Sequence, residues 1–190
     1  MNIILTTFFT TDKDPQRPLV WGSDDITLVK DFHESLIKHD LNCIILHDNS
    51  PEEFINKLTT DKIKWVRVNS SGLNMVDIRW VLYHQLIQSM PWVEKVFCLD
   101  ISDVIILKNP FELMDPDKVY CGDEECLNKD NFWMMERFNW MKHPEVTDRI
   151  HEYVNNKVLN CGIVGGNRKN MLEITNKMGT ILKESNIQNT

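Results

Sequence analysis

The stretch VFCLDISDVIILKNPF, residues 96–111, decides how the rest of the chain is interpreted. It begins as an almost continuous apolar run, which is typical of a strand in a sheet that is covered on both faces. Asp100 and Asp103 interrupt that run, three residues apart. Two carboxylates at about 4 Å repel each other by roughly 4 kcal/mol at an effective dielectric constant near 20. A protein therefore keeps such a pair where a cation or a shared proton lies between the two groups.

A divalent cation is one partner that would explain this pair. Mg²⁺ and Mn²⁺ prefer oxygen ligands, and two carboxylates leave open positions for the phosphates of a substrate. The pair therefore indicates transfer from a phosphate-linked donor, with the metal neutralising a diphosphate leaving group. The alternative is a structural role, in which Asp100 caps a turn and Asp103 is solvated.

Length and composition limit the class of protein. The chain has 190 residues, of which 42% are hydrophobic and 26% are charged, and this suits one globular domain. The formal net charge of −7 and the lack of a basic patch argue against a nucleic-acid partner. The sequence contains no run of about 20 apolar residues, so no membrane span is expected. The five cysteines lack paired spacing, which favours free thiols in a reducing, cytoplasmic compartment.

Strand-like and helix-like segments alternate along the chain. The expected strands are 2–9, 42–48, 64–69, 94–100, 103–110, 118–124 and 157–166, and the expected helices are 23–40, 50–58, 75–90, 143–154 and 167–184. This alternation predicts an α/β fold with a mainly parallel central sheet flanked by helices. Ligands bind at the carboxyl ends of such strands. In this chain, that edge would hold residues 6–10, Asp48, Asn69 and residues 100–103.

Two segments resemble a known family. Residues 76–111, VDIRWVLYHQLIQSMPWVEKVFCLDISDVIILKNPF, look like the centre of a GT-A glycosyltransferase, where a helix with an arginine precedes the strand that ends in a DxD-type metal motif. Asp100 and Asp103 match the DxxD variant of that motif. Residues 159–172, LNCGIVGGNRKNML, resemble the N-x-G-x-x-G-G segment that lines the donor-sugar pocket. The chain is also similar to the compact glycosyltransferase domains encoded by large chlorella viruses.

The resemblance implies one GT-A domain over residues 1–190, either by itself or as the N-terminal part of a longer protein. It implies a metal-dependent hexosyl- or deoxyhexosyltransferase that uses a UDP-sugar and a glycan or protein-linked acceptor, in the cytoplasm of the host if the chain is viral. A non-catalytic domain of the same fold that binds a nucleotide sugar or a glycan is the alternative. A DxDxT-type phosphatase fits less well, because two residues separate the aspartates and no threonine follows.

The resemblance also implies roles for particular residues. Asp100 and Asp103 would bind Mn²⁺ or Mg²⁺. The donor and its nucleoside would contact residues from four parts of the chain: Thr6, Thr7, Phe8, Phe9, Arg79, Asp100, Asn160 and Gly162. Of these, Arg79 would approach the diphosphate or the sugar, while Asn160 and Gly162 would face the sugar. For Phe8 and Phe9 a place in the core at the end of a strand is an equally good interpretation.

Further residues are candidates for the acceptor side. Asp123 or Glu124 could take the proton of the acceptor hydroxyl, as inverting transferases require, although a solvated acidic loop is the alternative. The aromatic run at 131–144 is expected to be a core helix or an acceptor platform. Many family members supply a third metal ligand, often histidine. His143 and His151 are candidates for it, although neither lies in a matching motif.

Overall fold

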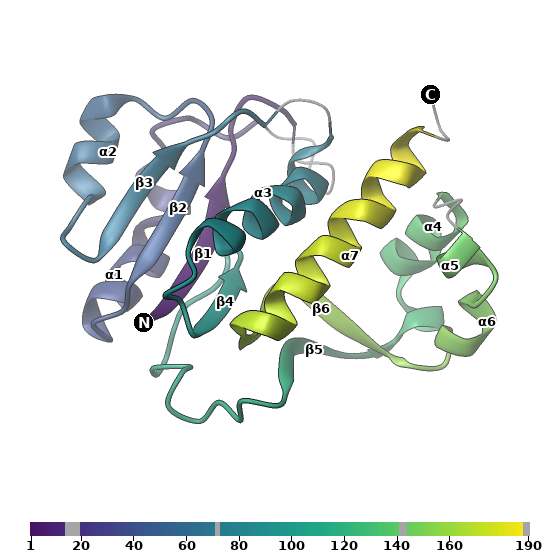
Figure 1. Ribbon diagram of the computed structural model, residues 1–190. Coiled ribbons are helices and arrows are strands. Elements are labelled where there is room, and N and C mark those ends of the chain that lie inside the picture. The colour runs from purple at the N-terminus through teal and green to yellow at the C-terminus, as the bar shows by residue number, and fades with distance from the viewer. Residues whose placement is uncertain (14–19, 71–72, 141–143, 188–190) are drawn as a thin grey trace.

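Six strands form one sheet in the order β3-β2-β1-β4-β6-β5 (Figure 1). The computed structural model describes residues 1–13, 20–70, 73–140 and 144–187. The strands are β1 (Asn2–Phe8), β2 (Cys43–His47), β3 (Ile63–Arg67), β4 (Lys95–Leu99), β5 (Val119–Leu127) and β6 (Lys157–Asn167). Strands β3, β2, β1 and β4 are parallel, whereas β6 and β5 run antiparallel to their neighbours. The predicted α/β class with a mainly parallel sheet is confirmed.

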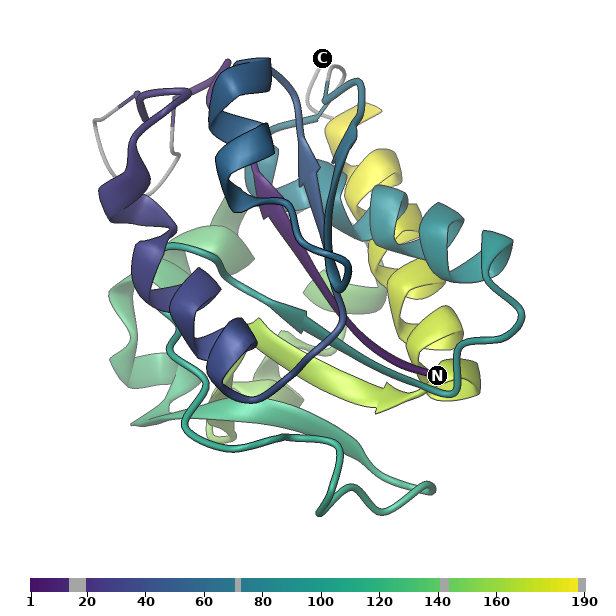
Figure 2. The same ribbon diagram turned by 90° about the vertical axis from the view of Figure 1, so that its left-hand side faces the viewer.

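Helices cover both faces of the sheet (Figure 2). The longer ones are α1 (Lys30–Lys38), α2 (Glu52–Leu58), α3 (Met75–Ser89), α4 (Phe132–Trp140) and α7 (Arg168–Ile187). The short ones are η1 (Ile26–Leu28), η2 (Asn128–Asp130), α5 (Pro144–Thr147) and α6 (Ile150–Tyr153). Helices α1 and α2 lie on one face, α3 and α7 lie on the other, and α4 to α6 gather beyond the far ends of β5 and β6.

Side chains of β1 point alternately to the two faces of the sheet and belong to two separate cores. Ile4 and Phe8 pack with α1 and α2, whereas Ile3 and Leu5 pack with α3 and α7. Successive side chains of a strand point to opposite faces, so one apolar run supplies both cores. Because both faces are covered by helices, polar ligands can reach this strand only at its ends.

The expected strand at 103–110 is not formed. Both sides of β4 are already paired, with β1 on one side and β6 on the other. The segment instead crosses the surface, where Ile106 is buried while Ile105 and Leu107 are 55% and 82% exposed. Its apolar residues suggested a strand, but β4, which it follows in the chain, has no free side with which it could pair.

Other boundaries differ by smaller amounts. The expected helix at 143–154 is two short helices, α5 and α6. The expected helix at 23–40 begins with the 3-10 turn η1, which Asp25 caps by accepting the Thr27 N–H. Strand β5 extends three residues beyond the expected 118–124, and its pairing with β6 contains register shifts. The irregular pairing bends this edge of the sheet.

Burial of His47 should make stability depend on pH. This side chain is 3% exposed and packs edge-on against Trp65. Burial and the nearby charge of Arg67 lower the pKa of His47, although Asp48 acts in the opposite direction. Below a pH of about 6.5 the unfolded chain would bind a proton at this position that the folded chain resists. The free energy of unfolding should therefore fall as the pH decreases through this range.

The variant His47→Phe tests this expectation, because phenylalanine keeps a buried ring and cannot be protonated. Urea unfolding of wild type and variant at a series of pH values between about 7 and 5 should give a shallower pH dependence in the variant. Equal slopes would mean that other groups cause the acid sensitivity.

Candidate active site

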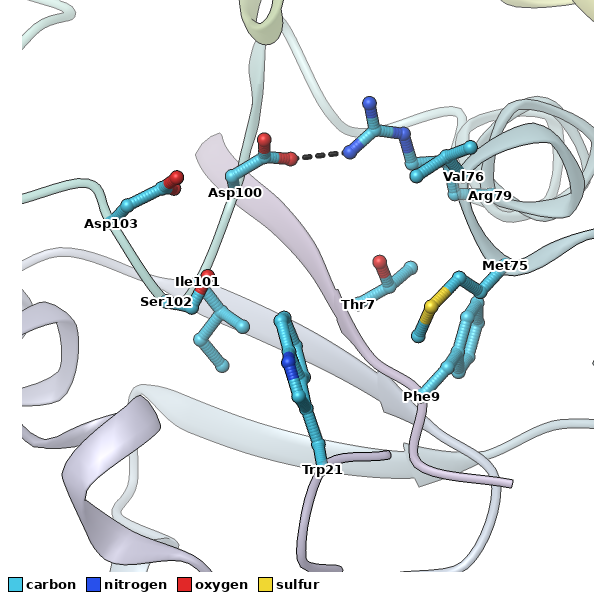
Figure 3. Close-up of a pocket in the computed structure, with 10 residues that line it drawn as sticks. All are labelled: Thr7, Phe9, Trp21, Met75, Val76, Arg79, Asp100, Ile101, Ser102 and Asp103. Carbon is cyan, nitrogen blue, oxygen red and sulfur yellow. Dashed lines mark hydrogen bonds and ion pairs between the residues drawn. The ribbon is translucent and has the colours of Figure 1, made fainter. Parts of the chain in front are cut away.

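An open hollow lies at the carboxyl edge of the parallel strands (Figure 3). Its empty space of about 510 Å³ includes solvent at the open mouth. Its lining comes from the ends of β1 and β4, the start of α3 and one residue before η1: Thr7, Phe9, Trp21, Met75, Val76, Arg79, Asp100, Ile101, Ser102 and Asp103. The edge that the sequence predicted as the ligand site is thus where the hollow lies.

Helix α3 holds Arg79 at this edge. Asn74 caps the helix, because its side-chain oxygen accepts the N–H groups of Val76 and Asp77 at 3.1 and 3.0 Å. One turn further on, the Arg79 guanidinium donates to Asp100 Oδ1 from a position where its side chain is only 8% exposed. Burial is the largest single effect on Arg79 and would lower its pKa, but the charge and hydrogen bond of Asp100, together with the smaller effects of Cys161 and Tyr83, outweigh it, and the net pKa is raised. The site therefore contains a permanent positive charge.

Asp100 is held by the backbone of β6. Its N–H donates to the carbonyl of Gly162 at 2.8 Å. A Cβ atom at position 162 would lie 2.8 Å from Asp100 Cγ and from Asn160 Oδ1, which is closer than side chains tolerate. The absence of a side chain at Gly162 therefore allows Asp100 and Asn160 to approach this strand. This gives the glycine a steric role beside the carboxylate.

Asp103 is exposed and borders the same hollow as Asp100. Figure 3 shows the two carboxylates along one side of the hollow, with Arg79 beyond Asp100. In the described ranges, no three side chains of His, Cys, Asp or Glu group closely enough to form a metal site by themselves. Two carboxylates nevertheless suit Mg²⁺ or Mn²⁺, provided that water and substrate phosphates supply the other ligands.

An apolar wall faces the charged side. Phe9, Trp21 and Met75 form it, and Trp21 is stacked on buried Phe8 with ring centroids 6.0 Å apart. The sequence analysis missed Trp21, because it lies in a polar connection that has no strand or helix periodicity. A lone tryptophan between two such elements, next to a ligand-binding edge, was the one clue available.

The structure brings together five of the predicted site residues: Thr7, Phe9, Arg79, Asp100 and Asp103 all line the hollow. Thr6 and Phe8 do not line it. Both are fully buried, and Phe8 belongs to the core beside α1 and α2. Alternation along β1 explains this split, because only every second residue can face the hollow.

Asn160 and Gly162 lie next to the hollow. Asn160 Oδ1 accepts the Gly162 N–H at 2.6 Å, and its amide group donates to Glu124 Oε1. A chain of hydrogen bonds therefore runs from Asp100 through Gly162 and Asn160 to Glu124 on β5. This connects the predicted donor residues with one of the two predicted base candidates.

Asp123 has different surroundings. It forms an ion pair with Lys157 at 2.7 Å and accepts the Glu125 N–H at 2.8 Å. The hydrogen bond from Lys157, followed by that from Glu125, lowers the pKa of Asp123. A general base works best with a pKa near the operating pH, so these contacts weaken Asp123 as a base.

The remaining predicted groups lie elsewhere. His151 is exposed on α6, away from the residues that line the hollow, and His143 lies outside the described residues. The aromatic run at 131–144 forms α4 over Phe132–Trp140, with Phe132 at 81% exposure. In the described part of the chain, neither His143 nor His151 is found at the two aspartates.

The strand order and the position of the hollow define a GT-A fold, which solved structures share. One of these is the galactosyltransferase LgtC in complex with donor and acceptor sugar analogues, with a TM-score of 0.54, 13% identity and 97% of this chain covered. Another is an active-site mutant of LgtC, with a TM-score of 0.55, 12% identity and 96% coverage. The chain spans 66% and 65% of the lengths of these two proteins.

Sequence comparisons add no family to this assignment. No protein-family model matches the sequence, and no curated protein does. No helix within the described ranges is long and apolar enough to cross a membrane. The activity has to be argued from the site.

Proposed function

We propose that this chain is a metal-dependent glycosyltransferase domain. It would move a hexosyl or deoxyhexosyl group from a nucleoside-diphosphate sugar, with UDP as the expected nucleotide, to a glycan or protein-linked acceptor. The observation that carries the proposal is the convergence of Arg79, Asp100 and Asp103 on one hollow of a GT-A fold. Two carboxylates and a guanidinium at one place suit a diphosphate that a divalent cation bridges.

The charged side of the hollow would take the diphosphate. Asp100 and Asp103 would hold Mn²⁺ or Mg²⁺, and the bound metal would supply neutralisation of the diphosphate leaving group. Arg79 would contribute a fixed positive charge, because its position is set by α3 and by the bond to Asp100. Because Arg79 is already in position, it would not have to reorient when negative charge develops on the leaving group.

The apolar side would take the nucleoside. Thr7 and Phe9 would border it, and the face of Trp21 would offer a surface on which a base can stack. Phe8 would support this wall from the core, because its ring is stacked on Trp21, and Thr6 would lie buried in β1 beneath the nucleoside. Asn160 and Gly162 would face the sugar from β6.

Glu124 is the better candidate of the two for the acceptor-activating base. Its contact with Asn160 connects it to the donor side, whereas Asp123 is engaged by Lys157.

A non-catalytic domain that binds a nucleotide sugar remains the second candidate, because every donor contact named above would serve binding without turnover. For both candidates we propose one domain over residues 1–190 that acts in the cytoplasm. We also keep the proposal of a viral origin.

Calorimetric titration with UDP tests the donor site. Binding in the presence of Mn²⁺ that disappears with a chelator would support a metal-bridged diphosphate. Release of sugar from UDP-glucose, UDP-galactose or UDP-rhamnose would then distinguish an enzyme from a binding domain. If UDP binds neither with metal nor without it, the assignment of the hollow to this donor is wrong.

A further inference from the structure

One carboxylate outside the hollow ties together two segments that build the apolar wall. Asp48 follows β2 directly and is half-buried. Its Oδ1 accepts the Thr10 N–H at 2.9 Å, and its Oδ2 accepts the Thr11 N–H at 3.3 Å. The same Oδ2 also accepts the hydroxyl of Ser70 at 3.1 Å. Three donors from two distant parts of the chain therefore converge on this side chain.

Both segments are close in sequence to residues that line the hollow. Thr10 follows Phe9, which lines the apolar wall. Ser70 lies between β3 and the cap of α3, and the first turn of α3 supplies Met75 and Val76 to the same lining. Asp48 itself does not line the hollow. It can thus influence a ligand only by setting where these two segments lie.

The chemistry of these bonds makes the carboxylate difficult to replace. Backbone N–H groups that are bound to an ionised acceptor form shorter and stronger hydrogen bonds than neutral pairs do. Asparagine at position 48 would keep one acceptor oxygen, but its amide group would face a donor. Thr10 is only 5% exposed and Ser70 only 9%, so water has little access to replace a lost bond.

We propose that Asp48 is a positioning residue for the nucleoside end of the donor site. The inference rests on the proposed function, because it assumes that the apolar wall takes the nucleoside and the charged side takes the diphosphate. It follows that a change at Asp48 should weaken binding of the nucleoside part and leave binding of the diphosphate part unchanged. General destabilisation of the fold would instead weaken binding of the nucleoside part and of the diphosphate part alike.

The experiment compares two probes on the variant Asp48→Asn. UDP with Mn²⁺ contains the nucleoside and the diphosphate, whereas magnesium pyrophosphate contains only the diphosphate. We expect the Kd for UDP to rise about tenfold, equivalent to about 1.4 kcal/mol, while the Kd for pyrophosphate stays within about twofold of wild type. Ser70→Ala removes one of the three bonds and should give a smaller rise for UDP. It also serves as the test if Asp48→Asn does not fold.

Asp115→Asn is the matched control. Asp115 also accepts a turn N–H, from Asp117, but it lies near the amino end of β4, where Lys95 donates to the carbonyl of Met114. The variant Asp115→Asn should leave the Kd values for UDP and for pyrophosphate unchanged. If Asp48→Asn and Ser70→Ala bind UDP as wild type does, or lose both probes equally, the inference is overturned. If wild type itself does not bind UDP, the proposed function fails first, and the inference fails with it.

Discussion

Replacing Asp103 by alanine should abolish Mn²⁺-dependent binding of UDP and leave the chain folded. The side chain is exposed and lines the hollow, so its removal opens no cavity in either core. Removal of one of two carboxylate ligands should weaken metal-bridged binding by about a hundredfold or more, equivalent to about 2.7 kcal/mol. Without metal the variant should stay close to wild type in stability, because the substituted side chain is exposed.

Calorimetry with UDP and Mn²⁺, together with thermal unfolding, measures both parts of this result. Asp117→Ala is the matched control, because Asp117 is an exposed aspartate in the same connection between β4 and β5 and does not line the hollow. It should bind UDP as wild type does. Asp103→Ala that binds UDP with unchanged affinity would exclude Asp103 as a metal ligand.

Gly162→Ala should weaken UDP binding and stability together. The added Cβ would lie 2.8 Å from Asp100 Cγ, so the carboxylate would have to leave the position in which it accepts the hydrogen bond from Arg79. The guanidinium would then stay buried with a poorer partner, which is costly in a protein interior. We expect at least about a tenfold loss of UDP affinity and a decrease of about 1–3 kcal/mol in the free energy of unfolding.

Gly166→Ala, on the same strand, separates this effect from a general cost of replacing glycine. A Cβ at position 166 would have its nearest neighbours at 3.5 Å, which is ordinary van der Waals contact. Calorimetry and urea unfolding of the two variants should therefore differ clearly. Equal behaviour would show that the space beside Asp100 is not critical.

The parallel half of the fold could be predicted because its strands are short apolar runs that end in polar residues. The run at 94–100 is β4 with one extra residue at each end, and Asp100 lies at its carboxyl end as expected. Helix α3 was predicted at 75–90 and is formed at Met75–Ser89, a difference of one residue. In these segments, local sequence preference and tertiary packing agree.

The sequence could not reveal features that depend on neighbours. The apolar segment at 103–110 reads as a strand, but it follows β4, whose two sides are both occupied by other strands. The direction of β6 relative to β4 is equally a property of the sheet. Among the candidate site residues, Thr6 and Thr7 look alike in sequence, and the pleat of β1 alone decides that Thr7 faces the hollow.

The central position of β1 in the sheet has a consequence for synthesis of the protein. This strand is made first, yet one of its partners is β4, where Asn2 is paired with Lys95. Closing such a long loop is entropically costly and slow. The charged side of the hollow further requires β6, because Gly162 holds Asp100. An emerging chain could therefore bind no donor until β6 has left the ribosome, and donor binding would report completion of the sheet.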